Sequence, residues 1–173
     1  IGEEPKTINP ITATDAYARS VHNYVMDSLL TRNPSTYGWD PGIAESYEVS
    51  KDGLQFTFKI RKNGFFHDDQ PVTAADVKFS FDTIFDDRFS LFHMRPYFEN
   101  IEKAELVDAD TVRFVAKKKY FGNFDVLAQL TIVPKHIYEK MDENNKLNKT
   151  VIGTGPYFLE RYDKGQLIVL KKN

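Results

Sequence analysis

The chain contains no cysteine, which excludes disulfides, thiolate nucleophiles and cysteine-based zinc sites. It has no excess charge of one sign, because 23 lysines and arginines face 25 aspartates and glutamates. A nucleic-acid-binding protein usually needs a basic face that neutralises phosphates, so this balance argues against that class. No apolar run approaches the ~20 residues that span a bilayer. With 41% hydrophobic residues in 173, the chain can bury a real core.

The chain starts at Ile1 rather than methionine, and no signal peptide is visible. An apolar stretch at Leu167–Leu170 is followed at once by the last residues. We therefore expect a processed or trimmed piece of a longer protein. The absence of cysteine suits an exported chain that avoids oxidative mispairing.

Hydrophobic periodicity predicts the first half of the secondary structure. A helix capped by Thr14 or Asp15 would bury a stripe of Ala18, Val21, Val25 and Leu29. The Pro-, Gly- and Asn-rich stretch 33–42 reads as a loop, and strict alternation over 54–61 predicts a half-buried antiparallel strand.

That strand would pair with 47–49 through a tight turn at Asp52-Gly53. Thr73 and Asp76 form a capping-box pattern, which predicts a second helix there. The buried stripe of this helix is expected to contain Val77, Phe81, Ile84 and Phe85.

The second half of the sequence predicts further antiparallel hairpins and short helices. We expect a hairpin from 101–107 and 111–116, helices at 123–130 and 134–141, an exposed loop at 142–150, and a hairpin from 153–162 and 165–170. The sum is a mixed α and β chain with mainly antiparallel pairing.

The most reactive-looking cluster is His67-Asp68-Asp69, since imidazole and carboxylates are good metal ligands. Adjacent residues of an extended segment point to opposite faces, so they rarely hold one ion together. A turn explains the same residues, because Asp favours turns. The sequence favours the turn and leaves a metal-dependent hydrolase using His67, Asp68 and Asp69 as the alternative.

Other catalytic patterns do not occur. The chain lacks the Gly-x-Ser-x-Gly elbow of serine hydrolases. Gly153-Thr154-Gly155-Pro156 is rich in glycine, but no lysine follows and no helix is expected after it, so a P-loop is not predicted. The proline and Tyr157 indicate instead a rigid lead into a strand. We expect no enzyme activity and no cofactor.

Five motifs follow one another along the whole chain. They are EPKTINP at 4–10, PGIAESYEVSKDGL at 41–54, FHDDQPVTAADV at 66–77, IVPKH at 132–136 and GTGPY at 153–157. In this order they resemble the family 5 extracellular solute-binding proteins, the oligopeptide- and dipeptide-binding components of ABC importers. Tyr47 replaces the usual Trp of the family, and Asp69 replaces the Gly of its His-Asp-Gly turn. Asp69 must then adopt the φ that the glycine held, which Asp tolerates better than most residues.

The resemblance implies a periplasmic-binding-protein-like fold of the class II or cluster C type. The chain would be an N-terminal lobe fragment with an inserted subdomain, since family members are roughly three times longer, beyond single-domain size. Residues 1–40 would start the first lobe, 41–150 would form the inserted subdomain, and 151–173 would return to the first lobe. The second lobe would be absent.

The resemblance also implies where a ligand would lie. In the family the segment after Asn9-Pro10 runs along the cleft, so the leading candidates are Ile11, Thr12, Ala13, Thr14 and Asp15. An extended backbone there would pair with a peptide as an added strand. For Asp15, holding a ligand amine competes with capping the following helix.

Other candidate ligand-binding residues lie in two places: in the loop after the helix capped by Thr73, and in the 33–42 loop. Phe92, His93 and Met94 would reach the cleft from the inserted subdomain, with core packing or surface exposure as the alternative. For Trp39, anchoring of its own loop competes with stacking on a ligand.

The implied function is substrate capture for an ABC importer, with this chain giving one wall of the cleft. The expected partners are a peptide or other small molecule and a membrane permease, with no nucleic acid and a monomeric state. Family members take peptides, nickel complexes, opines or oligosaccharides, and the sequence does not choose among them. The expected location is the periplasm or, through a lipid anchor, the cell surface.

Overall fold

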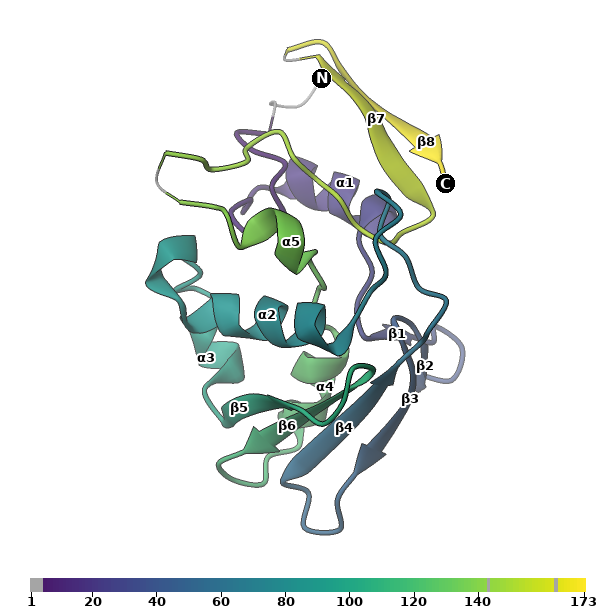
Figure 1. Ribbon diagram of the computed structural model, residues 1–173, viewed down its shortest axis with the longest axis vertical. Helices are drawn as coiled ribbons and strands as arrows, with labels where there is room; N and C mark the ends of the chain where they lie inside the picture. Colours follow the sequence, from purple (N-terminus) through teal and green to yellow (C-terminus); the bar gives the residue numbers. More distant parts are fainter. Residues whose placement is uncertain (1–4, 143, 164) are drawn as a thin grey trace.

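The computed structural model describes residues 5–142, 144–163 and 165–173 (Figure 1). Its helices are α1 (Ala16–Val25), α2 (Ala74–Phe85), a 3-10 turn η1 (Asp87–Phe89), α3 (Arg95–Phe98), α4 (Gly122–Ala128) and α5 (Lys135–Tyr138). Its strands are β1 (Leu30–Arg32), β2 (Trp39–Pro41), β3 (Ala44–Val49), β4 (Gln55–Ile60), β5 (Ile101–Leu106), β6 (Thr111–Ala116), β7 (Tyr157–Asp163) and β8 (Leu167–Lys172). All strand pairs among these are antiparallel, as the sequence predicts.

A four-stranded sheet with the order β3-β4-β6-β5 forms the lower part of the molecule (Figure 1). The predicted alternation of β4 is confirmed, because Phe56, Phe58 and Ile60 are buried while Gln55 and Lys59 are exposed. Gly53 has a φ of 71° in the turn between β3 and β4, a conformation that favours glycine. The local pattern therefore sets both the strand and its turn.

Helix α2 covers one face of this sheet, where the Phe81 ring lies 5.4 Å from that of Phe114 on β6. The predicted capping box forms: the Asp76 carboxylate accepts hydrogen bonds from the backbone amide and hydroxyl of Thr73, at 2.9 and 2.7 Å. Its other oxygen accepts the Lys135 amide at 2.9 Å, which joins α2 to α5. The prediction that Phe85 is buried is wrong, because the last turn of α2 extends past the core and leaves this ring 42% exposed.

Helix α1 lies in the upper part, next to the β7–β8 ribbon (Figure 1). Asp15 is its N-cap, and the carboxylate accepts the Ala18 amide at 2.8 Å. Ala18, Val21 and Val25 are buried as predicted, whereas Leu29 lies beyond the helix. Leu29 is nevertheless fully buried, because the chain turns inward before β1.

Two predictions from the sequence differ from the structure: one misses a strand, and the other makes two helices too long. The stretch 33–42 is not all loop, because Trp39–Pro41 pairs with β1. Helices α4 and α5 are shorter than the predicted 123–130 and 134–141. The backbone amide of Leu130 bonds to Leu127 and that of Met141 to Tyr138, so tight turns end both segments.

The segment Gly153–Gly155 is packed against the end of α1, and we call it the glycine segment. A Cβ on Gly153 would lie 2.0 Å from the Val25 carbonyl oxygen, and one on Gly155 would lie 2.6 Å from that of Tyr24. The Gly155 amide donates to the Val25 carbonyl at 2.9 Å. As predicted, the segment leads into a strand, β7, rather than a helix.

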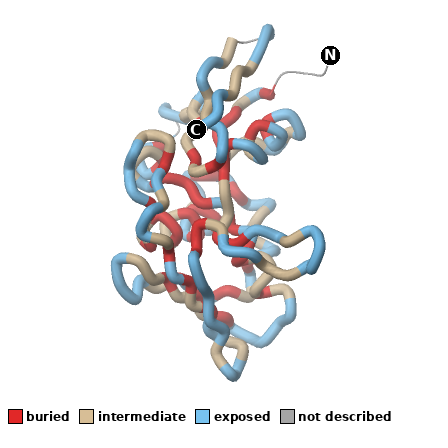
Figure 2. Tube along the Cα trace, turned by 90° about the vertical axis from the view of Figure 1, so that its right-hand side faces the viewer, coloured by how far each residue is buried: buried red, intermediate tan, exposed pale blue. Residues whose placement is uncertain are grey.

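Buried positions run through the middle of the molecule, from α1 to the four-stranded sheet (Figure 2). One hydrophobic core therefore joins the upper and lower parts. Within residues 5–142, 144–163 and 165–173, no helix has the length and apolar character needed to cross a membrane.

The close packing of the glycine segment predicts a large effect of a single methyl group. Gly153→Ala should destabilise the chain by about 3 kcal/mol, because backbone atoms rather than a flexible side chain occupy the space. Gly38→Ala is the matched control, since its nearest neighbour is the Thr36 hydroxyl at 3.3 Å. Urea unfolding monitored by circular dichroism measures both. Equal midpoints for the two variants would show that the segment is loosely packed.

Candidate functional site

A pocket of about 650 Å³ lies between α1, the segment before it, α2 and the loop before α3. It is lined by Pro10, Ile11, Ala13, Thr14, Arg19, His22, Asn23, Met26, Asp27, Ser28, Thr31, Ser80, Thr83, Ile84, Leu91, His93, Met94, Phe98, Gln129, Leu130, Thr131 and Val133. Its wall combines apolar side chains with carboxylate, guanidinium and imidazole groups. Such a mixture in a concave site suits a small ligand that has both apolar and polar parts.

The structure brings several predicted site residues together although they lie about 80 positions apart. Ile11, Ala13, Thr14, His93 and Met94 all line the pocket. The first three come from the segment before α1, and the last two come from the loop before α3. The upper and lower parts of the molecule thus both contribute to one concave surface.

The other predicted residues lie outside the pocket lining. The Phe92 ring is exposed and stacks on the Arg95 guanidinium, 4.5 Å from its centre. Trp39 packs edge-on against Phe124 at 6.2 Å, with the Arg32 guanidinium over its ring. Asp15 caps α1.

The backbone before α1 is a turn rather than the predicted extended strand. Asn9 closes it: its side-chain oxygen accepts the Ile11 amide at 2.9 Å, and its carbonyl accepts the amides of Thr12 and Ala13. The Asn9 side chain is itself fully buried and donates to the Lys146 carbonyl at 2.8 Å. The prediction of an extended backbone is therefore wrong for 11–13, where three backbone donors are already used within the turn.

His22 forms part of the pocket wall and holds the turn in place. Its Nε2 lies 2.9 Å from the Ile8 carbonyl oxygen, to which it donates. Burial lowers the pKa of the imidazole below its ordinary value, although the bond to Ile8 and the charge of Asp15 act in the opposite direction. The neutral ring with its proton on Nε2 satisfies both the burial and the hydrogen bond.

The wall from α2 is fixed by hydrogen bonds of its own. The Ser80 hydroxyl donates to the Asp76 carbonyl at 2.7 Å and accepts the Val133 amide at 2.9 Å. The Thr83 hydroxyl donates to the Ser80 carbonyl at 2.8 Å. These buried polar groups already have partners, so they shape the pocket and leave its exposed groups to meet a ligand.

Sequence reasoning did not select the part of α1 that lines the pocket. Arg19, His22 and Asn23 of α1 and its C-cap Met26 follow one another at intervals of three, one and three residues. Such spacing places them on one helix face, beside the buried stripe of Ala18, Val21 and Val25. The signal was present as a polar stripe, but a polar stripe is equally typical of a solvated surface.

The metal-dependent hydrolase is not supported by the geometry of His67. Its Nδ1 accepts the Gly153 amide at 3.3 Å and its Nε2 donates to the Gly155 carbonyl at 2.9 Å, so both ring nitrogens are occupied. Asp68 points to another partner, His136, at 2.7 Å. Asp69 has a φ of 62°, the left-handed conformation expected where it replaces glycine. Across the described part of the chain, no three His, Cys, Asp or Glu side chains gather as a metal site.

Comparison with known proteins agrees with the family resemblance of the sequence. A family model described as bacterial extracellular solute-binding proteins, family 5 Middle, matches residues 38–173. The glutathione-binding protein GsiB of Escherichia coli K12 is 28% identical over 182 residues, covering 99% of this chain and 33% of GsiB. The chain thus spans about a third of the length of this curated relative.

Two solved structures are similar over nearly the whole chain. NikZ of Campylobacter jejuni, in complex with Ni(L-His), has a TM-score of 0.85 and 30% identity, covering 100% of this chain and 34% of NikZ. The oligopeptide-binding protein AppA of Bacillus subtilis, in complex with a nonapeptide, has a TM-score of 0.83 and 27% identity, covering 98% of this chain and 34% of AppA.

The lowered pKa of His22 predicts a pH-dependent stability. In the unfolded chain the ring binds a proton more strongly, so stability should be complete above the unfolded pKa and fall as pH drops below about 6.5. His22→Gln keeps a donor for Ile8 without titrating, so it should lose less stability between pH 7.5 and pH 5. Each unit of pKa difference corresponds to about 1.4 kcal/mol.

Urea unfolding at several pH values measures this difference. His93→Gln is the matched control, because His93 is exposed, and it should follow the pH profile of the unsubstituted chain. Parallel profiles for His22→Gln and the unsubstituted chain would contradict the role of His22.

Proposed function

Because the chain belongs to family 5 of the bacterial extracellular solute-binding proteins, we propose that it supplies one wall of the ligand cleft in the substrate-binding component of an ABC importer. The observation that carries this proposal is the pocket itself. Ile11, Ala13 and Thr14 meet His93 and Met94 there, across a volume of about 650 Å³. Small-molecule sites have volumes of about 300–1,000 Å³, so the pocket has a suitable size.

The proposed ligand is a peptide or a similar small solute. Met94 offers apolar surface, while Arg19 and Asp27 offer charges of opposite sign to a carboxylate and an amine. GsiB binds glutathione, AppA was solved with a nonapeptide and NikZ with a nickel–histidine complex, and all three ligands contain amino-acid groups. The family consists of solute-binding proteins, and we propose that this chain likewise has no catalytic role.

In a protein as long as the relatives, the part outside this chain would provide the opposite wall of the cleft. Hinged closure around the ligand would then be the signal that a membrane permease reads. In this proposal 1–40 and 151–173 belong to the first lobe and 41–150 form an inserted subdomain. The protein would act as a monomer in the periplasm or, through a lipid anchor, at the cell surface.

The test uses a protein that contains this chain and has the full length of the relatives. Thermal-shift screening with peptides of two to nine residues, glutathione and Ni(L-His) should reveal a ligand that raises the melting temperature by mass action. Arg19→Ala and Met94→Ala should each weaken that ligand by about tenfold, because the first removes a charge and the second an apolar contact from the pocket.

Tyr97→Ala is the matched control, since its ring is 65% exposed and does not line the pocket. It should leave the affinity unchanged. Unchanged affinity in both pocket variants would place the ligand elsewhere, and equally tight binding by the 173-residue chain alone would contradict the one-wall proposal.

A further inference from the structure

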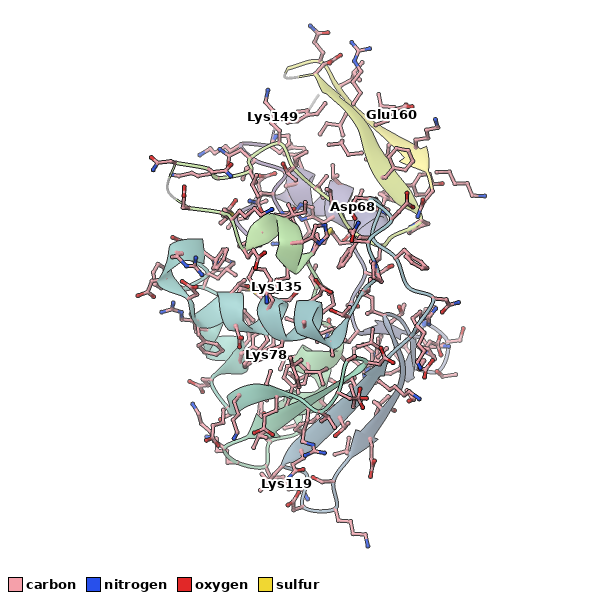
Figure 3. All side chains as sticks on the ribbon, viewed as in Figure 1. Asp68, Lys78, Lys119, Lys135, Lys149 and Glu160 are labelled. Carbon is pink, nitrogen blue, oxygen red and sulfur yellow. The ribbon has the colours of Figure 1, made fainter. Side chains whose placement is uncertain are left out.

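A basic and aromatic loop lies at the end of the molecule opposite to the β7–β8 ribbon (Figure 3). Residues Lys117-Lys118-Lys119-Tyr120-Phe121 connect β6 to α4, and we call them the KKKYF loop. Figure 3 labels Lys119 at the lower end, far from the β7–β8 ribbon and the C-terminus. All five residues are exposed, Tyr120 to 47% and Phe121 to 88%. Tyr120 and Phe121 therefore place two adjacent aromatic rings on the surface.

The loop is held firmly although its side chains are exposed. The buried Asn123 side chain donates to the Lys118 carbonyl at 3.0 Å, and its amide donates to the Tyr120 carbonyl at 3.2 Å. The Tyr120 ring lies over Gly122, where a Cβ would come within 2.7 Å of the ring. The two aromatic rings are 4.6 Å apart. The fold therefore presents Phe121 outward in a defined orientation.

Positive charge surrounds the aromatic pair. The aliphatic stem of Lys119 lies against Gly53, which brings it beside the β3–β4 turn with its exposed Lys51. The Lys117 ammonium donates to the Glu99 carbonyl at 2.7 Å, and a carbonyl partner leaves its charge uncompensated. Asp52 is an acidic neighbour that attracts Lys119 and offsets one of the four lysine charges.

We propose that the KKKYF loop and Lys51 dock on the surface of an anionic lipid bilayer. An aromatic side chain is favourable at the headgroup level of a membrane, and lysines beside it attract anionic lipids. The loop protrudes and does not line the pocket, so a broad fluid surface fits it better than an inserted peptide or small molecule. The pocket lining contains no residue of this loop, so docking here would leave the pocket free to exchange its ligand.

Vesicle co-sedimentation tests this proposal with the chain in solution. Vesicles of phosphatidylcholine with about 30% phosphatidylglycerol should bind the chain at least tenfold more strongly than phosphatidylcholine alone. Raising the salt concentration from about 0.1 to about 0.5 M should reverse most of the difference, because screening weakens exposed charges. Equal binding to both vesicle types would overturn the proposal.

Substitutions separate the contribution of the lysine charges from that of the aromatic ring. The triple variant Lys117→Gln/Lys118→Gln/Lys119→Gln should reduce binding to anionic vesicles at least tenfold. The matched control with the same change in charge, Lys140→Gln/Lys146→Gln/Lys149→Gln, alters exposed lysines elsewhere and should retain binding. Phe121→Ser should reduce binding several-fold, whereas Tyr37→Ser, at a ring 73% exposed, should not.

Circular dichroism and urea midpoints verify that the variants remain folded. A general effect of charge, with both triple variants losing binding equally, would overturn the assignment to this loop. Binding only to vesicles that contain a permease would also overturn it and would assign the loop to a protein partner.

Discussion

The contact between His67 and the glycine segment joins three parts of the chain that are distant in sequence. The imidazole accepts from the Gly153 amide and donates to the Gly155 carbonyl, while Gly155 donates to the end of α1. Only glycine fits between these backbones. This contact links the segment before α2 to the end of α1, and both helices line the pocket.

The features that could be predicted from the sequence depend on interactions between residues close together in the chain. The period of β4, the capping box of Thr73 and Asp76 and the cap of α1 each depend on residues a few positions apart. The turn closed by Asn9 could not be predicted, because its buried side chain is fixed by Lys146, 137 positions away. The same limit applies to Trp39, whose partner Phe124 lies on another element.

The candidate pocket was partly predictable for a related reason. Resemblance to a family supplied the segment after Pro10 and the loop at His93, whereas the polar face of α1 has no local signal that distinguishes it from a solvated surface. The pocket wall and the KKKYF loop use different elements, held by separate hydrogen bonds. Ligand choice and surface docking can therefore change independently by substitution.

The glycine segment also has a consequence for the order of folding. The strands of the four-stranded sheet all lie between residues 44 and 116, so this sheet can assemble early from hairpins that are local in sequence. Helix α1 is made earlier but finds its partners, the glycine segment and β7, only after residue 153. The contacts that fix the end of α1 therefore form late, and until then the chain is more open to misassembly and to capture by chaperones.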